Sequence, residues 1–220
     1  HITMYCDDKI KNPFNLKINV LNIEELTNKF LEWLNSEKII ESKKLIEKEK
    51  NEVKELMEKL GQLDKSSLEF IDLVLYGLLP YGKTKYAKRV SRFPVFLNIK
   101  TFLKNYEYSE EDWKDIANRI YNLVDNFQKE PEKIKLWIDE FASDKKYSRM
   151  LQCGSISPIL FCINDSYPVI NNKIIRTYRD FSRAFNWGDK MSQKLVDYVE
   201  NLEKCKKLIK FLKIEEVKDL

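Results

Sequence analysis

Residues 77–84, GLLPYGKT, match the pattern G-x-x-x-x-G-K-[ST] with which many nucleotide hydrolases bind phosphates. A working loop of this kind follows a buried strand and offers successive backbone N–H groups to the phosphates. Pro80 has no N–H to offer, and the apolar residues of the preceding segment recur at helical spacing. We therefore expect a helix end followed by a basic turn, with a P-loop nucleotide-binding protein as the alternative hypothesis.

Other catalytic chemistry lacks the residues that it needs. The only histidine is His1, in a three-residue start ahead of Met4 that we interpret as a cloning remnant. Without a histidine, a Ser-His-Asp site, a Cys-His site and a histidine-ligated metal site each lose their central residue. The four cysteines form no C-x-x-C pair of the kind that indicates a zinc site. We therefore expect no catalytic residue, no metal and no enzyme activity in this chain.

One long stretch of the chain contains cations without carboxylates. Residues 73–106 include seven lysines and arginines and no aspartate or glutamate. Tyrosines are interleaved with these cations, and this combination suits phosphate neutralisation and base stacking. The alternative is a solvated basic face with no ligand. The predicted nucleic-acid contacts in this stretch are Lys83, Lys85, Lys88, Arg89 and Arg92, with Tyr81 and Tyr86 as base-stacking candidates.

A second basic stretch begins at residues 171–172, where two asparagines predict a turn before a helix that resumes near Ile174. Cations at i, i+3 and i+7 of this helix share one face near its N-terminus, where they can bind phosphates through bidentate bonds. Alternatively, they pair with surface carboxylates. Trp187 lies in a polar loop, and the alternative to base stacking is that it folds back on the body. The predicted contacts are Asn171, Asn172, Lys173, Arg176, Arg179 and Arg183, with Tyr178 and Trp187 as base-stacking candidates.

The elements that must position these residues are expected to be helices. Residues 167–175 are the exception, where we expect a short strand or an extended loop. The predicted fold class is mainly α, a compact multi-helix domain with a long N-terminal helical hairpin. Gly61 is the expected stop of the hairpin's second helix, Ser66 or Ser67 caps the next helix, and Ser109 with Asp112 forms a capping box. Apolar spacing predicts helices at 22–35, 37–60, 68–79, 109–129, from Pro131, 159–163, from about 174, and 191–214.

We divide the chain into the cloning remnant (residues 1–3), an N-terminal segment with the helical hairpin (4–64) and a helical DNA-recognition body (65–220). The helix at 37–60 has a narrow apolar seam formed by Ile39, Ile46, Val53 and Leu60. We expect the seam to pack on the body, and the alternative is a helical assembly module that pairs with another chain. No apolar run approaches the ~18 residues that span a bilayer. The abundance of Lys, Glu and Ile is typical of thermophile proteins, and we expect a cytoplasmic protein without a membrane partner.

Several motifs in the two basic stretches and the C-terminal helix resemble a known family. SPILFCINDSYPVINNK at residues 157–173, ENLEKCKKLIKFL at 200–212, and VLYG followed by KRVSRF at 88–93 are similar to the region ahead of the motor domain in archaeal McrB-like proteins. The resemblance covers about residues 68–212. It implies a DNA-recognition domain for an attached AAA+ GTPase motor, which acts with a nuclease subunit to cut DNA that carries modified bases.

From this resemblance we expect a DNA-binding specificity domain of a modification-dependent restriction system with a role in defence. Its partner is double-stranded DNA that contains modified cytosine, methylated cytosine foremost. In the family, GTP and magnesium belong to the motor, so we expect no cofactor in this fragment. A modified cytosine can be read in the major groove or extruded into an aromatic pocket, and both modes remain open.

Overall fold

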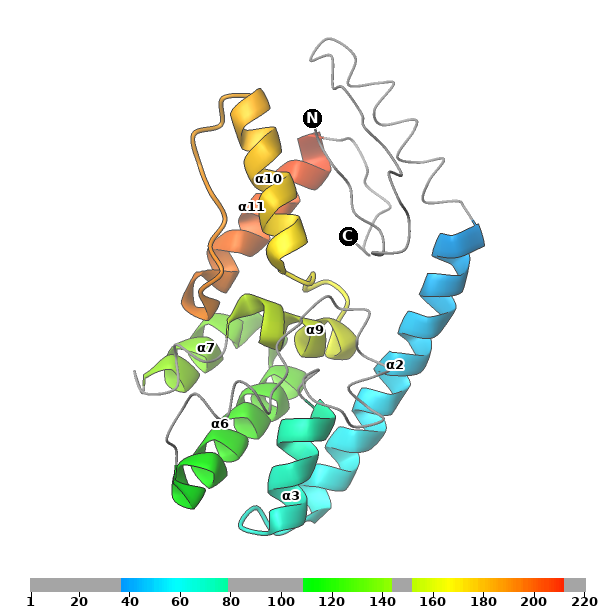
Figure 1. Ribbon diagram of the computed structural model, residues 1–220, viewed down its shortest axis with the longest axis vertical. Coiled ribbons are helices and arrows are strands. Elements are labelled where there is room, and N and C mark those ends of the chain that lie inside the picture. Colours follow the sequence, from blue (N-terminus) through cyan, green and yellow to red (C-terminus); the bar gives the residue numbers. More distant parts are fainter. Residues whose placement is uncertain (1–36, 79–108, 144–151, 212–220) are drawn as a thin grey trace.

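The computed structural model describes residues 37–78, 109–143 and 152–211, and within these ranges every regular element is a helix (Figure 1). The mainly α fold class is therefore confirmed. A π-helical turn, η1 (Leu73–Leu78), continues α3, and short 3-10 turns precede α7 (η2, Pro131–Lys133) and α11 (η3, Leu195–Asp197). The α-helices are α2 (Glu37–Gln62), α3 (Leu68–Asp72), α6 (Glu110–Lys129), α7 (Ile134–Ala142), α9 (Cys153–Ile163), α10 (Asn172–Ala184) and α11 (Tyr198–Phe211).

Helix α2 is a long arm that lies along η1 and α9 (Figure 1). Its apolar seam is buried at Val53 and Leu60, which confirms for these residues the prediction that the seam packs on the body. Helix α2 also forms an ion pair with the turn after α9, where Lys50 Nζ lies 3.2 Å from Asp165 Oδ2. Gly61 was expected to end the helix, but it lies inside the last turn. The first arm of the predicted hairpin, at 22–35, lies outside the described residues.

The middle helices begin where their capping residues predict. Ser67 Oγ accepts a hydrogen bond from the backbone N–H of Phe70 at 3.1 Å, so Ser67 caps α3. Ser109 and Asp112 exchange side-chain and backbone hydrogen bonds at the start of α6, which confirms the predicted capping box. Pro131 opens the 3-10 turn that leads into α7, whose buried residues are Ile134, Ile138 and Phe141.

The C-terminal part differs from the prediction at three boundaries. Helix α9 begins at Cys153, five residues before Pro158, although proline lacks the N–H for an intrahelical bond. Tertiary packing outweighs this cost, because nearly every residue of α9 is buried. A turn at residues 165–166 and an irregular stretch without a strand follow, and α10 begins at Asn172. Helix α11 begins at Tyr198, seven residues later than the predicted start at Met191.

The late start of α11 has a tertiary cause. Asn201 is fully buried, and its side chain accepts a hydrogen bond from Ser192 N at 3.1 Å and donates one to Ser192 O at 2.7 Å. Lys194 forms an isolated antiparallel bridge with Gln152, just before α9. These contacts hold residues 192–194 in a non-helical path.

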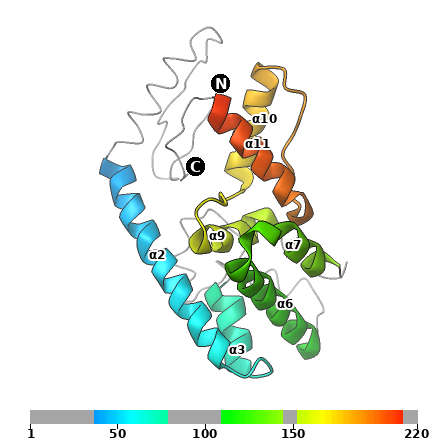
Figure 2. The same ribbon diagram turned by 180° about the vertical axis from the view of Figure 1, so that it is seen from behind.

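Helices α10 and α11 form one end of the molecule, and α3 and α6 lie at the other end (Figures 1 and 2). Tyrosine hydroxyls connect the segment after α9 to its neighbours: Tyr167 donates to Pro131 O at 2.8 Å, and Tyr198 donates to Pro168 O at 3.1 Å. The Tyr167 ring also packs edge to face on Phe127 of α6, with 4.8 Å between the ring centroids. None of the described helices is long and apolar enough to span a membrane.

Candidate nucleic-acid interface

Helix α10 carries arginines on its solvent-exposed face. Its buried face consists of Tyr178, Phe181 and Ser182, so the residues on the other side of the helix face water. Arg176, Arg179 and Arg183 are all exposed, as their i, i+3, i+7 spacing predicts. With a rise of about 1.5 Å per residue, these three residues extend over about 10 Å of helix. We call this set of three residues the arginine row.

Two members of the arginine row make no ion pair with any residue in the described ranges. Arg179 Nε lies 3.2 Å from Asp180 Oδ1, its sequence neighbour, but no carboxylate pairs with Arg176 or Arg183 there. Three of the four lysines of α11 differ, because Lys204, Lys206 and Lys207 each pair with a carboxylate. The alternative hypothesis of pairing with surface carboxylates therefore applies only to Arg179.

Positive charge is concentrated in the same part of the chain. Residues 171–211 contain ten lysines and arginines against five aspartates and glutamates. Residues 109–143, which include α6 and α7, contain five against nine. Three of the chain's seven arginines lie within eight residues of α10, although lysine is otherwise the usual cation. Arginine suits bidentate contacts with phosphate, so this local enrichment agrees with the phosphate contacts predicted for these residues.

The two asparagines at the start of α10 do not form the predicted turn. Asn171 is the N-cap residue of α10 and is 9% exposed. Its Oδ1 accepts hydrogen bonds from the backbone N–H groups of Lys173 and Ile174, at 2.8 and 3.1 Å. Asn172 is exposed, and its Oδ1 accepts a hydrogen bond from Gln193 Nε2 at 2.6 Å. Both side chains, predicted as nucleic-acid contacts, therefore have hydrogen-bond partners within the chain.

The two stacking candidates of this region pack against the protein itself. Tyr178 has no exposed surface, so its ring is not available to a base in this structure. Trp187 is half-buried, folded back beside Tyr178, and the Lys207 ammonium lies 4.5 Å from the centroid of its ring. Trp187 therefore adopts the arrangement that was the alternative to base stacking, in which it folds back on the body. The aromatic cluster around Trp187 comprises Tyr178, Phe181, Phe185 and Phe211.

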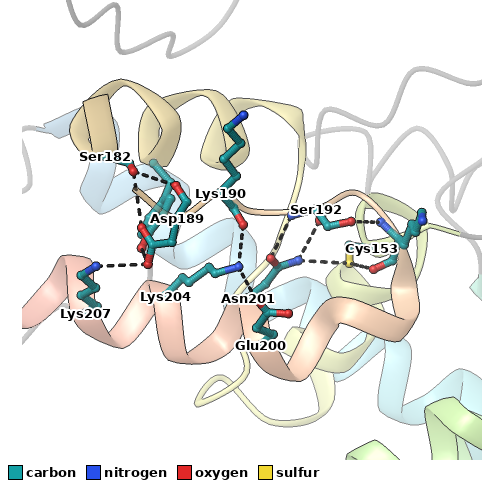
Figure 3. Close-up of polar contacts among 11 residues, drawn as sticks. Cys153, Ser182, Asp189, Lys190, Ser192, Glu200, Asn201, Lys204 and Lys207 are labelled. Atoms are coloured by element: carbon teal, nitrogen blue, oxygen red, sulfur yellow. Dashed lines mark hydrogen bonds and ion pairs between the residues drawn. The ribbon is translucent and has the colours of Figure 1, made fainter. Parts of the chain in front are cut away.

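The connection between α10 and α11, residues 185–194, is fixed by polar contacts (Figure 3). Asp189 accepts hydrogen bonds from both helices: Tyr178 Oη of α10 lies 2.9 Å and Lys207 Nζ of α11 lies 3.1 Å from its Oδ2. Burial works against ionisation of Asp189, but hydrogen bonds from Tyr178 and Lys207 outweigh it and hold the pKa of this carboxyl below its usual value. Burial, and then the bond to Asp189, raises the pKa of the Tyr178 phenol. The connection turns through positive φ at Asn186 (52°) and Gly188 (75°).

The other predicted contacts, Lys83, Lys85, Lys88, Arg89, Arg92, Tyr81 and Tyr86, lie outside the described residues. Gly77 and Leu78, the first two residues of the GLLPYGKT motif, lie in the π-helical turn after α3. The residues ahead of the motif are thus helical, as we expected, whereas a phosphate loop follows a strand. A P-loop enzyme also needs a strand that ends in a magnesium-binding carboxylate, and LWIDE at residues 136–140 is the sequence that comes nearest to this pattern. These residues lie inside helix α7. The described ranges contain no group of His, Cys, Asp or Glu suited to a metal ion.

Comparison with known proteins adds no relative, because no family model, no curated protein and no solved structure matches this chain. The fold and the surface together define a mainly α-helical protein with an arginine-bearing helix at one end.

Proposed function

We propose that the chain is a DNA-binding domain whose arginine row contacts the phosphates of a duplex. The observation that carries the proposal is the arginine row itself, in which Arg176 and Arg183 are exposed and make no ion pair within the described ranges. Each guanidinium group can bind a phosphate through two parallel hydrogen bonds, and the two groups lie on one helix face about two turns apart. The excess of cations over residues 171–211 supports the same assignment.

The biological part of the proposal rests on the resemblance to McrB-like proteins over residues 68–212. In this proposal the chain is the specificity domain of a cytoplasmic modification-dependent restriction system and recognises DNA with modified cytosine, methylated cytosine foremost. An attached GTPase motor and a nuclease subunit supply the chemistry. Phosphate contacts carry no base identity, so other residues must discriminate the modified base. Tyr178, Asn171 and Asn172 are engaged within the chain. We retain Tyr81 and Tyr86, and also Trp187, which packs in the aromatic cluster but is only half-buried.

The test is a titration against two duplexes of identical sequence, one unmodified and one with methylated cytosine, at several salt concentrations. Arg176, Arg179 and Arg183 are replaced by alanine together. The matched control replaces three exposed lysines of α2, Lys44, Lys48 and Lys54, which changes the net charge by the same amount at a distance from α10.

We expect the parent chain to bind both duplexes with a strong salt dependence and to prefer the modified one. The arginine variant should weaken binding to both duplexes alike and reduce the log–log salt slope by about 0.9 per lost phosphate contact. The α2 control should keep the parent's slope. Equal losses in the two variants would mean that net charge alone matters, and the proposed interface would be wrong.

A further inference from the structure

Asp189 is the point where donors from α10 and α11 meet. Tyr178 Oη of α10 donates a hydrogen bond to Asp189 Oδ2 at 2.9 Å. Ser182 Oγ, also of α10, donates one to the Asp189 backbone oxygen at 2.7 Å. Ser182 Oγ also lies 3.4 Å from Asp189 Oδ1. From α11, Lys207 Nζ lies 3.1 Å from Oδ2. Figure 3 shows Asp189 between these two helices.

The two α10 donors lie on the buried side of the helix, whereas the arginine row is exposed. Tyr178 and Ser182 are four residues apart and therefore share one face, because α-helical residues repeat every 3.6 positions. Tyr178 follows Arg176 by two residues, which places the two side chains roughly 200° apart around the helix axis. Any rotation of α10 that moves the arginine row also breaks the hydrogen bonds to Asp189. The rotation of α10 and the direction of its arginines are therefore coupled to Asp189, to its carboxylate through Tyr178 and to its backbone oxygen through Ser182.

Lys207 secures the other side of the contact. Its ammonium pairs with Asp189 and lies over the Trp187 ring, whose indole packs beside Tyr178 and Phe211. Lys207 is thus engaged between α11 and the connection.

We propose that Asp189 is a positioning residue for DNA binding: its carboxylate holds α10 at the rotation that presents Arg176, Arg179 and Arg183 together to the phosphates. This inference rests on the proposed function for its consequence, because positioning serves binding only if the arginine row contacts DNA. It assigns to an acidic residue, which repels DNA, a role in binding DNA.

The sign of one substitution separates positioning from plain electrostatics. Asp189→Ala raises the net charge by one unit, and electrostatics alone would strengthen binding to a polyanion. Positioning predicts the opposite: about tenfold weaker binding and a lower salt slope, because the carboxylate bonds from Tyr178 and Lys207 are lost and only the Ser182 bond to the backbone oxygen remains. Asp180→Ala is the matched control: it raises the charge equally without touching the Asp189 contacts, and it also releases Arg179 of the row from its ion pair. It should bind DNA as tightly as the parent or more tightly.

A double-substitution experiment tests whether Asp189 acts through the arginine row. In the background of the triple arginine-to-alanine variant, Asp189→Ala should cause no loss of affinity and at most the small gain that its added charge gives, because there is no row left to position. All measurements use a temperature at which circular dichroism shows each variant fully folded. Tighter binding by Asp189→Ala, or an undiminished loss in the triple background, would overturn the inference.

Hydrogen exchange tests the clamp independently of DNA. Backbone amides of α10 should exchange about tenfold faster in Asp189→Ala, while those of α6 keep their parent rates. If the parent chain binds no duplex, the proposed function is wrong. The exchange rates of α10 in Asp189→Ala and in the parent still show whether Asp189 holds this helix. Unchanged exchange would refute the inference even in a chain that binds DNA.

Discussion

Asn171 Oδ1 accepts a hydrogen bond from the backbone N–H of Lys173 at 2.8 Å, and this contact makes Asn171 the N-cap of the helix that carries the arginine row. Asn171→Ala should lower the free energy of unfolding by about 1 kcal/mol, the usual effect of losing such a cap. Asn171→Asp keeps an acceptor at the cap and should retain the parent's stability. Urea unfolding of the three proteins measures the difference. If alanine were tolerated without loss, the cap would have no energetic role.

The pair of Asp189 with Tyr178 and Lys207 predicts a pH dependence of stability. The pKa of Asp189 is lowered in the folded state, so its ionised form stabilises the fold above the ordinary aspartate pKa of about 3.9, and this contribution is lost as the pH falls through the lowered value. Asp189→Asn should therefore be less stable than the parent near neutral pH, and the difference should shrink in acid. Urea unfolding at a series of pH values measures it. A difference that is constant with pH would contradict the assignment.

The buried cysteines provide a test of the core. Burial raises the pKa of the Cys153 and Cys205 thiols to about 12. At pH 8 only about one thiol in ten thousand is then ionised, so alkylation by iodoacetamide should be very slow in the folded protein and fast in urea. Peptide mass mapping after timed exposure reports each cysteine separately. Rapid alkylation of Cys153 without denaturant would mean that α9 opens readily.

The GLLPYGKT motif should not bind nucleotide. The residues ahead of it are helical, and Pro80 removes a backbone donor. We therefore expect neither the parent chain nor Lys83→Ala to bind nucleotide. Calorimetric titration of the parent and the variant with GTP and ATP in magnesium measures this directly. Saturable, magnesium-dependent binding that requires Lys83 would restore the P-loop hypothesis.

The parts of the fold that were predictable are those that depend on local chemistry. A serine three residues ahead of an acidic residue predicted the start of α6 at Ser109, and the serine pair predicted the start of α3. Pro158 misled the prediction for α9, because burial of almost the whole helix outweighs the missing hydrogen bond. The periodic pattern from Met191 predicted an early α11, but a single buried side chain, Asn201, holds Ser192 outside the helix.

In the candidate site, too, some residues could be predicted from local spacing and others only from the tertiary structure. The arginine row follows from helical spacing alone, and the same spacing places Tyr178 on the opposite, buried side, so its assignment as a stacking residue neglected the helix geometry. Asp189 could not be found from local patterns, because its partners come from positions 178, 182 and 207. Only tertiary structure brings these donors to one residue.

Within the described residues, the excess of cations over residues 171–211 and of carboxylates over residues 109–143 separates positive from negative charge and produces an electric dipole. A body with such a dipole turns in the field of a polyanion while it is still diffusing, so the basic end arrives first and fewer collisions are misdirected. The field of a polyanion fades over about 10 Å at 0.1 M salt, which confines this orientation to the last steps of approach. Added salt therefore slows association, whereas the lifetime of a formed complex depends on contacts at close range.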